Sequence, residues 1–397
     1  MPCRKPAILA LLLSISFGCN WVGVPPTSNE TTAPSAMPRS ETPPFAIQGR
    51  TNEGALAIHT FSQTGGDHDP CVSPDGNWLI FSSTRHVEKP QIYLKRIDSQ
   101  VVTRRTFSEY SNIQPKFSPD GTLIAYSSNA DGNWDVWIMP RDKGPSANLT
   151  SDLTTDEIHP TWHPTKPLLA FSSFDPATGE WYICVRSRRT GGLQILTPGL
   201  FPEWSADGKK IVYQKARERG VRWYSIWMID VTADTNDNVD CSQPVEVVWS
   251  DKWAAINPAW SPDGKHIAFA TVYKSPEAKS QNRVYSGDDI WMVGVDGRDL
   301  VRLTTTDCAD WDPWWAHAPE GGVGRIFFTS LMGGHCNIWS LQPIMIDTPG
   351  SIESGPEAGA DAEKEIIRKN LEAQKEQHPS IPVGTRIGAP AVAPEPK

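Results

Sequence analysis

Six residues that each stand directly before a proline are the strongest candidates for binding chemistry. They recur along the chain at similar spacing: Asp69, Gln114, His159, Phe201, Asn257 and Asp312. Five of the six are polar, and together they offer carboxylate, amide and imidazole groups. Such groups can hold a divalent cation or a polar ligand when a fold brings them together. The alternative is that these side chains are polar only because they line a solvated channel.

The prolines that follow these residues mark a sequence repeat. They stand at Pro70, Pro115, Pro160, Pro202, Pro258 and Pro313. Their separations of 45, 45, 42, 56 and 55 residues lie near the length of a four-stranded propeller blade, about 40 to 50 residues. Three copies continue into a Ser-Pro-Asp-Gly turn, at 73–76, 118–121 and 261–264, followed by a short apolar run. The repeat therefore predicts an all-β, six-bladed propeller with the pre-proline residues at the mouth of its central channel.

Two further columns of mainly aromatic residues follow the same register. One lies two residues after each proline: Val72, Phe117, Trp162, Trp204, Trp260 and Trp315. The other lies in the third predicted strand of each copy: Tyr93, Trp137, Tyr182, Trp227, Trp291 and Trp339. Rings at one fixed position per repeat are interpreted as wedges that fill the space between neighbouring sheets.

The last copy lacks a fourth strand. After Trp339 the sequence continues only to Leu341 before it becomes rich in proline, whereas residues 54–62, ahead of the first copy, read like the end of a repeat. The sequence therefore predicts that an N-terminal strand closes the last blade. Such closure leaves no open sheet edges in the ring.

The motif P-x-F/W-S-P-D-G, the stretch "DGNWDVWIM" and the "RLT" type of fourth strand resemble the TolB-like, WD-repeat-like six-bladed propellers of bacterial cell envelopes, over residues 54–342. The resemblance implies a non-catalytic module that binds an envelope protein or peptide. The alternative is a metal-dependent carbohydrate-active enzyme similar to oligogalacturonate lyase. That enzyme needs several histidine ligands, and here His159, with His68 and His335, are the candidates.

The two ends of the chain differ from the repeats. Residues 1–19 have the layout of an export signal that ends in Gly18-Cys19, which resembles a lipobox, so Cys19 is predicted to be lipidated; ordinary secretion is the alternative. Residues 20–50 form a Pro/Ser/Thr-rich tether, 51–343 the propeller and 344–397 a disordered tail. The protein is therefore expected on the periplasmic face of the envelope, as a lipid-anchored monomer.

Charge and motifs limit the function classes. The net charge is −9, with 37 Lys and Arg against 46 Asp and Glu, so nucleic acid is not an expected partner. The sequence has no Gly-x-Ser-x-Gly, P-loop, Cys-x-x-Cys or His-Glu-x-x-His motif. Binding is therefore favoured over catalysis, and a divalent cation at the channel mouth is the one cofactor that the residues suggest.

Five cysteines follow the predicted signal: Cys71, Cys184, Cys241, Cys308 and Cys336. Export places them in an oxidising compartment, where close cysteines usually pair. Only Cys308 and Cys336 share a blade and a face of the predicted fold. We therefore expect a Cys308–Cys336 disulfide, with Cys71 and Cys184 as buried thiols in strands.

Overall fold

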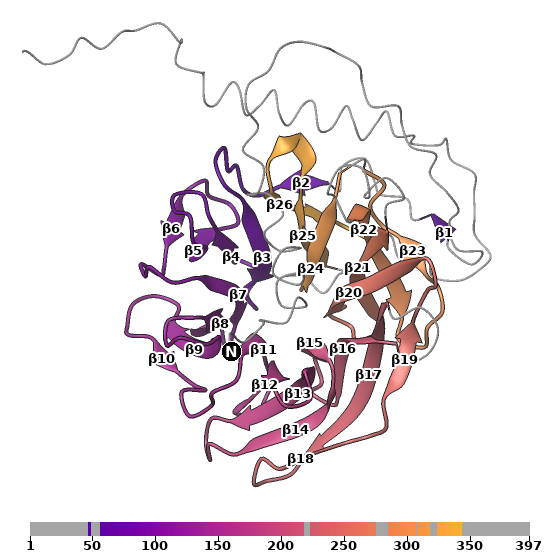
Figure 1. Cartoon of the computed structure of the whole chain (residues 1–397). Coiled ribbons are helices and arrows are strands. Elements are labelled where there is room, and N and C mark those ends of the chain that lie inside the picture. Colours follow the sequence, from indigo (N-terminus) through magenta and orange to yellow (C-terminus); the bar gives the residue numbers. More distant parts are fainter. Residues whose placement is uncertain are drawn as a thin grey trace, which may run out of the picture.

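The protein forms six β-sheets arranged as blades around a central channel (Figure 1). This computed structural model describes residues 47–48, 56–217, 223–274, 285–306, 308–317 and 324–343. The predicted all-β, six-bladed propeller is therefore confirmed. The predicted signal, Cys19, most of the tether and the C-terminal tail lie outside the described residues.

Blades 1 to 3 each contain four antiparallel strands, numbered from the channel outward. Blade 1 consists of β3 (Asp67–Val72), β4 (Trp78–Ser83), β5 (Gln91–Arg96) and β6 (Val102–Arg104). Blade 2 consists of β7 (Asn112–Phe117), β8 (Leu123–Ser128), β9 (Asp135–Pro140) and β10 (Ala147–Asn148). Blade 3 consists of β11 (Glu157–Trp162), β12 (Leu168–Asp175), β13 (Glu180–Ser187) and β14 (Leu193–Pro198).

Blades 4 to 6 carry additions to this plan. Blade 4 consists of β15 (Leu200–Trp204), β16 (Lys210–Ala216), β17 (Tyr224–Ala233) and β19 (Val245–Val248), and β18 (Val239–Cys241) pairs with the end of β17. Blade 5 consists of β20 (Trp253–Trp260), β21 (His266–Lys274), β22 (Tyr285–Gly294) and β23 (Val301–Arg302). Blade 6 consists of β24 (Asp310–Ala316), β25 (Arg325–Ser330), the 3-10 turn η1 (Met332–Gly334) and β26 (Asn337–Leu341).

The N-terminal strand closes blade 6, as predicted. Strand β2 (Ala57–Ile58) pairs antiparallel with β26, and the indigo β2 lies beside the yellow β26 in Figure 1. The next residues continue the contact, because Thr60 Oγ1 accepts a hydrogen bond from the Ile338 backbone N–H at 2.9 Å. Equivalent bonds occur within three other blades, with threonine acceptors at Thr106, Thr150 and Thr304. Residues 56–62 therefore take the structural role of a fourth strand.

One short strand falls within the predicted tether. Strand β1 (Ile47–Gln48) pairs in parallel with β23, with Ile47 opposite Val301. Blade 5 thus carries a fifth strand on its outer edge. The predicted tether, residues 20–50, is therefore attached to the propeller at this point.

The Ser-Pro-Asp-Gly stretches form the turns between the first and second strands. In the first copy the Ser73 hydroxyl donates to the Asp75 carboxylate and accepts from the Trp78 N–H, while Gly76 has a φ of 72°. Glycine adopts this left-handed conformation without the steric cost that a Cβ would add. We call the side of the propeller that carries these turns the turn face, and the opposite side, where the inner strands begin, the mouth face.

The aromatic columns pack between blades. One apolar cluster combines Cys71 and Ile80 of blade 1 with Phe117 and Tyr126 of blade 2. Trp291 and Trp339 are each only 1% exposed, and full burial of a large apolar side chain contributes roughly 2 to 3 kcal/mol. The wedge interpretation is therefore confirmed. These contacts fix the relative positions of the inner strands, which line the channel.

Candidate functional site: the channel and its cavities

The six pre-proline residues share an unusual backbone conformation. Each has a positive φ, between 52° and 57°. In every inner strand the pairing register shifts at this point, as it does between His68 and Cys71 in β3. A left-handed residue without glycine's freedom costs about 1 to 2 kcal/mol, and the following proline disfavours the ordinary helical conformation. The repeat therefore builds one strained bulge per blade at the same depth of the channel.

The structure brings the five predicted site residues together. A cavity of about 20 Å³ is lined by Asp69, Gln114, His159, Asn257 and Asp312, together with Lys116 and three of the anchor prolines. We call these five residues the channel ring. Phe201, the sixth pre-proline residue, instead packs against His159 with ring centroids 4.4 Å apart. A cavity of this size holds about one water molecule or one ion.

Several hydrogen bonds made by the channel-ring side chains join neighbouring blades. The Asp69 carboxylate accepts from the Gln114 N–H at 3.2 Å, and the Gln114 side-chain oxygen accepts from the His159 N–H at 2.9 Å. The Asn257 side-chain amide donates to Asp312. Each of these bonds satisfies a polar group inside the channel. The ring therefore fastens blade to blade, whatever else it binds.

Burial controls the protonation of the channel ring. Removal from water raises the pKa of Asp312 well above its usual range, and the nearby Asp69 carboxylate adds to this effect. Burial lowers the pKa of His159, and the Lys116 ammonium lowers it further. Asp312 Oδ2 and His159 Nδ1 are buried without a hydrogen-bond partner among the described residues. Both groups are therefore held toward their neutral forms.

The divalent cation suggested for the mouth stays a prediction. Among the described residues, no group of three or more His, Cys, Asp or Glu side chains has a geometry that could hold a metal ion. Asp69, His159 and Asp312 line one cavity but do not form such a group. The histidine candidate His68 is fully buried, and its ring lies 6.1 Å from that of Trp311. The described residues therefore offer no cluster of three such side chains for a metal ion.

A charged pair that sequence reasoning missed closes the channel below the ring. Lys116 Nζ lies 3.2 Å from Glu203 Oε2, and both side chains are about one-tenth exposed, at 11% and 9%. The Lys116 ammonium also lies over the Trp314 ring, 3.9 Å from its centroid. Each residue directly follows an anchor proline, so the three come from blades 2, 4 and 6. We call Lys116, Glu203 and Trp314 the partition.

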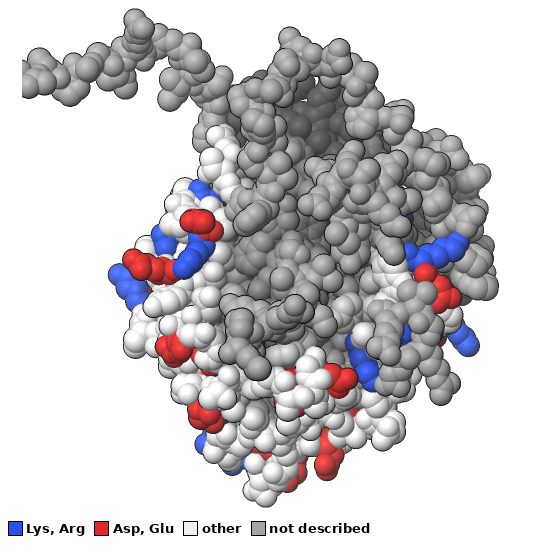
Figure 2. All heavy atoms as spheres, in the orientation of Figure 1, with Lys and Arg blue, Asp and Glu red and all other residues white. Residues whose placement is uncertain are grey.

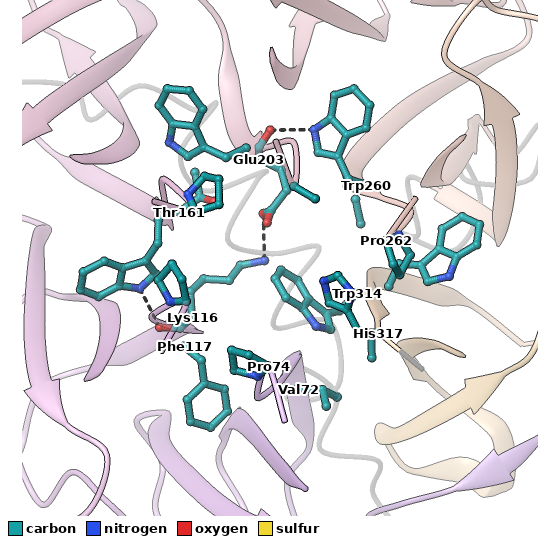
Figure 3. Close-up of a pocket in the computed structure, with 18 of the residues that line it drawn as sticks. Val72, Pro74, Lys116, Phe117, Thr161, Glu203, Trp260, Pro262, Trp314 and His317 are labelled. Atoms are coloured by element: carbon teal, nitrogen blue, oxygen red, sulfur yellow. Dashed lines mark hydrogen bonds and ion pairs between the residues drawn. The ribbon is translucent and has the colours of Figure 1, made fainter. Parts of the chain in front are cut away.

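A larger cavity opens on the turn-face side of the partition. It measures about 250 Å³, and Figure 3 shows the Lys116–Glu203 pair at its centre with tryptophan and proline side chains around it. Its wall repeats with the blades and includes Phe117, Trp162, Trp204, Trp260, Pro74, Pro119, Pro164 and Pro262. The indoles of Trp162 and Trp260 donate to the backbone oxygens of Lys116 and Glu203 at 3.1 and 2.9 Å. We call this cavity the vestibule.

Three inner strands begin with a buried carboxyl group. Asp67 is neutralised by Arg85 at 2.6 Å. Burial raises the pKa of Glu157 to about 7. Burial raises the pKa of Asp310 to about 8, and the neighbouring Asp289 contributes in the same direction. Two of the three equivalent positions therefore favour the protonated acid.

We expect the propeller to lose stability as the pH rises from about 5 to about 9. The folded-state pKa values of Glu157 and Asp310 lie above those of the unfolded chain, about 4. Their stabilising contribution is therefore complete below about pH 4 and is lost as the pH rises through 7 to 8. Urea unfolding should show a loss of at least about 1 kcal/mol over this interval. Asp310→Asn should flatten the profile, and an unchanged slope in that variant would contradict the assignment.

The predicted Cys308–Cys336 disulfide is wrong. Cys308 carries a thiol, as do Cys71, Cys184 and Cys241, whereas Cys336 is disulfide-bonded. Cys308 and Cys336 both contact one apolar cluster, and Met332 of the intervening turn η1 is part of that cluster. Cys308 and Cys336 therefore lie in one blade and on one face without forming a disulfide with each other. The prediction that Cys71 and Cys184 are buried thiols is confirmed.

The described surface and helices add two observations. On the face drawn in Figure 2, acidic and basic side chains alternate along the described outer rim. The described part of the chain contains no helix with the length and hydrophobicity of a membrane span.

Known proteins share this architecture. Residues 52–187 match the TolB beta propeller domain (PD40) family. An uncharacterized protein of Agrobacterium fabrum, Atu1656, is 28% identical over 43% of this chain and 65% of its own length. The Tol-Pal system protein TolB of Anaeromyxobacter dehalogenans is 30% identical over 23% of this chain and 21% of its own length. The chain thus spans less than two thirds of the length of these curated relatives.

A solved structure supports the fold over a longer stretch. The putative TolB from Agrobacterium tumefaciens superposes with a TM-score of 0.52 at 16% identity, over 73% of this chain and 97% of that protein. The family match covers the first two blades and the first three strands of blade 3, and the structural likeness extends the shared fold around the ring. Residues 52–187 are thus similar to the TolB propeller family, and the six observed blades share the fold of this solved propeller.

Proposed function

We propose that this protein is a non-catalytic propeller of the bacterial cell envelope that binds an extended peptide or a segment of an envelope protein. In this proposal it acts as a monomer and is tethered to the membrane by a lipid on Cys19. The names of its relatives, Tol-Pal system protein TolB among them, support an envelope role. The export-type N-terminus supports the same location.

The vestibule carries the proposal. The partition separates it from the channel ring, whose cavity of about 20 Å³ is too small for an organic ligand. The vestibule is more than ten times larger, at about 250 Å³, and is walled by aromatic and proline side chains. Aromatic-lined grooves suit apolar or proline-rich segments, whose extended backbone loses little entropy on binding. An extended apolar segment is therefore the occupant that this wall fits best.

The alternative function, a metal-dependent carbohydrate-active enzyme, has no specific observation in its favour. Oligogalacturonate lyase was suggested by its propeller fold, and fold alone does not establish activity. The described histidines do not gather into a metal site.

A photo-cross-linking experiment tests the proposed function. A photoreactive residue at His317, on the exposed rim of the vestibule, should cross-link a partner in solubilised envelope of the source bacterium. The same residue at Val101, on the outer edge of blade 1 and 72% exposed, is the matched control. A synthetic peptide from the captured partner should then bind the full chain. Trp314→Ala should weaken that binding at least about tenfold, because it removes a large aromatic contact. Equal capture at both positions would sink the proposal.

A further inference from the structure

A second large cavity lies away from the channel, between blades 3 and 4. It measures about 360 Å³ and opens near the mouth face, where β12 turns into β13 and where β16 ends. The chain between β14 and β15 forms its inner wall, through Pro198, Gly199 and Leu200. A volume of this size is typical of small-molecule sites. None of its lining residues belongs to the channel ring or the vestibule.

One buried amide in this cavity is only half satisfied. Gln214 is completely buried, and its side-chain oxygen accepts from the Asn257 N–H at 2.7 Å. Its amide nitrogen, Nε2, has no hydrogen-bond partner among the described residues. A buried donor without an acceptor is costly, and native proteins retain few of them. Gln214 therefore offers a ready donor to a ligand that carries an acceptor oxygen.

The position of Gln214 departs from the repeat. The equivalent residue in each second strand is small: Ser82, Ser127, Ser172, Ala270 and Thr329. In blade 3 the Ser172 hydroxyl already accepts the N–H of the next pre-proline residue, Phe201, at 2.9 Å. A short side chain is therefore sufficient for the structural role. The longer glutamine adds a second polar group that this role does not need.

The rest of the cavity wall combines aromatic and polar groups. Trp181 and Leu200 are 7% and 3% exposed and belong to one apolar cluster, against which Tyr224 also packs. Glu180 and Lys215 lie on the lining as well. The remaining cation, Arg217, lies 3.1 Å from Glu246 and 3.3 Å from Asp251. The cavity therefore presents flat apolar surfaces together with hydrogen-bond donors and acceptors. The charge of Arg217 is already neutralised by Glu246 and Asp251.

We propose that this cavity binds a neutral acetamido sugar of one or two rings. The C–H face of a pyranose can pack on an indole or phenol ring, as apolar surfaces do on aromatic side chains. The hydroxyl groups can donate to the Glu180 carboxylate. The acetamide oxygen can accept from Gln214 Nε2, and its methyl group can pack against Leu200. Such a sugar would provide a hydrogen-bond acceptor for the buried amide and would contact both the aromatic and the polar lining residues, without bringing an unpaired charge into the cavity.

The proposal is tested by titrating the full chain with N,N′-diacetylchitobiose and, in parallel, with cellobiose. The two disaccharides share the same linkage and ring framework, and only the first carries acetamide groups in place of the 2-hydroxyl groups. Isothermal calorimetry should show saturable binding of diacetylchitobiose and at least about tenfold weaker binding of cellobiose, the effect of one hydrogen bond to a buried group. No saturable binding up to about 10 mM, equal affinity for both sugars, or binding of a dipeptide but neither sugar would each overturn the proposal.

Two variants and a control localise the site. Gln214→Met keeps the side-chain length but removes both the Nε2 donor and the acceptor for the Asn257 N–H, so its folding is checked first. Trp181→Phe keeps the packing but reduces the aromatic face. Each variant should weaken binding about tenfold. Thr329→Val changes the equivalent buried position of blade 6, where the hydroxyl has no hydrogen-bond partner among the described residues, and should bind like the parent. If Gln214→Met fails to fold, Trp181→Phe and the parent titrations still decide the outcome. Parent-like binding by a folded Gln214→Met would place the sugar elsewhere and overturn the assignment.

Discussion

Deletion of residues 51–63 is expected to abolish the single cooperative unfolding transition of the propeller. The deletion removes β2 and the residues after it, so blade 6 is left with three strands and an exposed outer edge. Unpaired edges destabilise a sheet and invite pairing with other chains. The variant should therefore unfold over a broad range and associate in solution.

The contacts that would be lost are specific and largely buried. The His59 N–H donates to the Ile338 oxygen at 2.8 Å, and the Ser62 N–H donates to the Asn337 side-chain oxygen at 2.6 Å. Lys95 of blade 1 also donates to the His59 backbone oxygen. The N-terminal segment therefore joins blade 6 to blade 1. The loss should exceed the sum of its hydrogen bonds, about 0.5 to 1.5 kcal/mol each, because the ring loses its closure.

Circular dichroism and calorimetry measure this effect, and deletion of residues 344–397 is the matched control. That deletion leaves every described strand intact and should leave the melting curve unchanged. The point variant Thr60→Val removes the acceptor for the Ile338 N–H and the weaker donor to Asn337 Oδ1, and should cost about 1 to 3 kcal/mol while keeping cooperativity. A sharp, parent-like transition after removal of residues 51–63 would show that the closure is unimportant.

Replacement of Lys116 by methionine should destabilise the protein by about 3 kcal/mol. Lys116→Met preserves the length of the side chain but leaves Glu203 buried without its counter-charge. Removal of one partner from a buried ion pair typically costs about 3 to 5 kcal/mol, and the slight exposure of this pair places the value at the lower end. Denaturant unfolding at neutral pH provides the measurement.

The double variant Lys116→Met with Glu203→Leu should recover most of the lost stability. The double variant leaves no unpaired charge in the partition. Replacement of a buried ion pair by well-packed apolar side chains often leaves the free energy of unfolding unchanged. The loss in Lys116→Met alone should be smaller at about pH 5 than at about pH 8. Burial raises the pKa of Glu203 and Lys116 opposes that rise, so without the lysine the acid protonates more easily and needs no counter-charge. Strict additivity of the two single variants would refute a coupled pair.

Repetition made most of the fold predictable. Each copy contains a pre-proline residue, a turn and two mainly aromatic positions. One copy is a weak signal, but six copies in the same register together predict a six-bladed propeller. The same columns placed Asp69 and Asp312 in one ring although they are more than two hundred residues apart. The strand from 54–62 could be assigned to blade 6 because the last copy visibly lacked one.

The parts that were missed depend on contacts across the ring. Lys116 and Glu203 occupy the same repeat column, but only a closed channel of the right radius brings them within 3.2 Å. The signal was present, since these are the two charged residues in the column that follows the anchor prolines. The disulfide prediction failed for the related reason that a shared face does not fix the distance and direction of two side chains. Strand β1 was missed because two residues carry no periodicity.

Both ends of the described ring leave from the same side. Strand β26 runs toward the turn face, because Leu341 lies opposite Ile326 and Arg325 lies opposite Ala316. Strand β2 runs antiparallel to it, so the chain also enters the ring from the turn face. A domain or label fused after residue 343 would thus leave from the side of the ring that carries the vestibule. In the proposed lipid-anchored protein, the chain from Cys19 would likewise enter β2 from that side, which would bring the anchor and the vestibule to the same face of the ring.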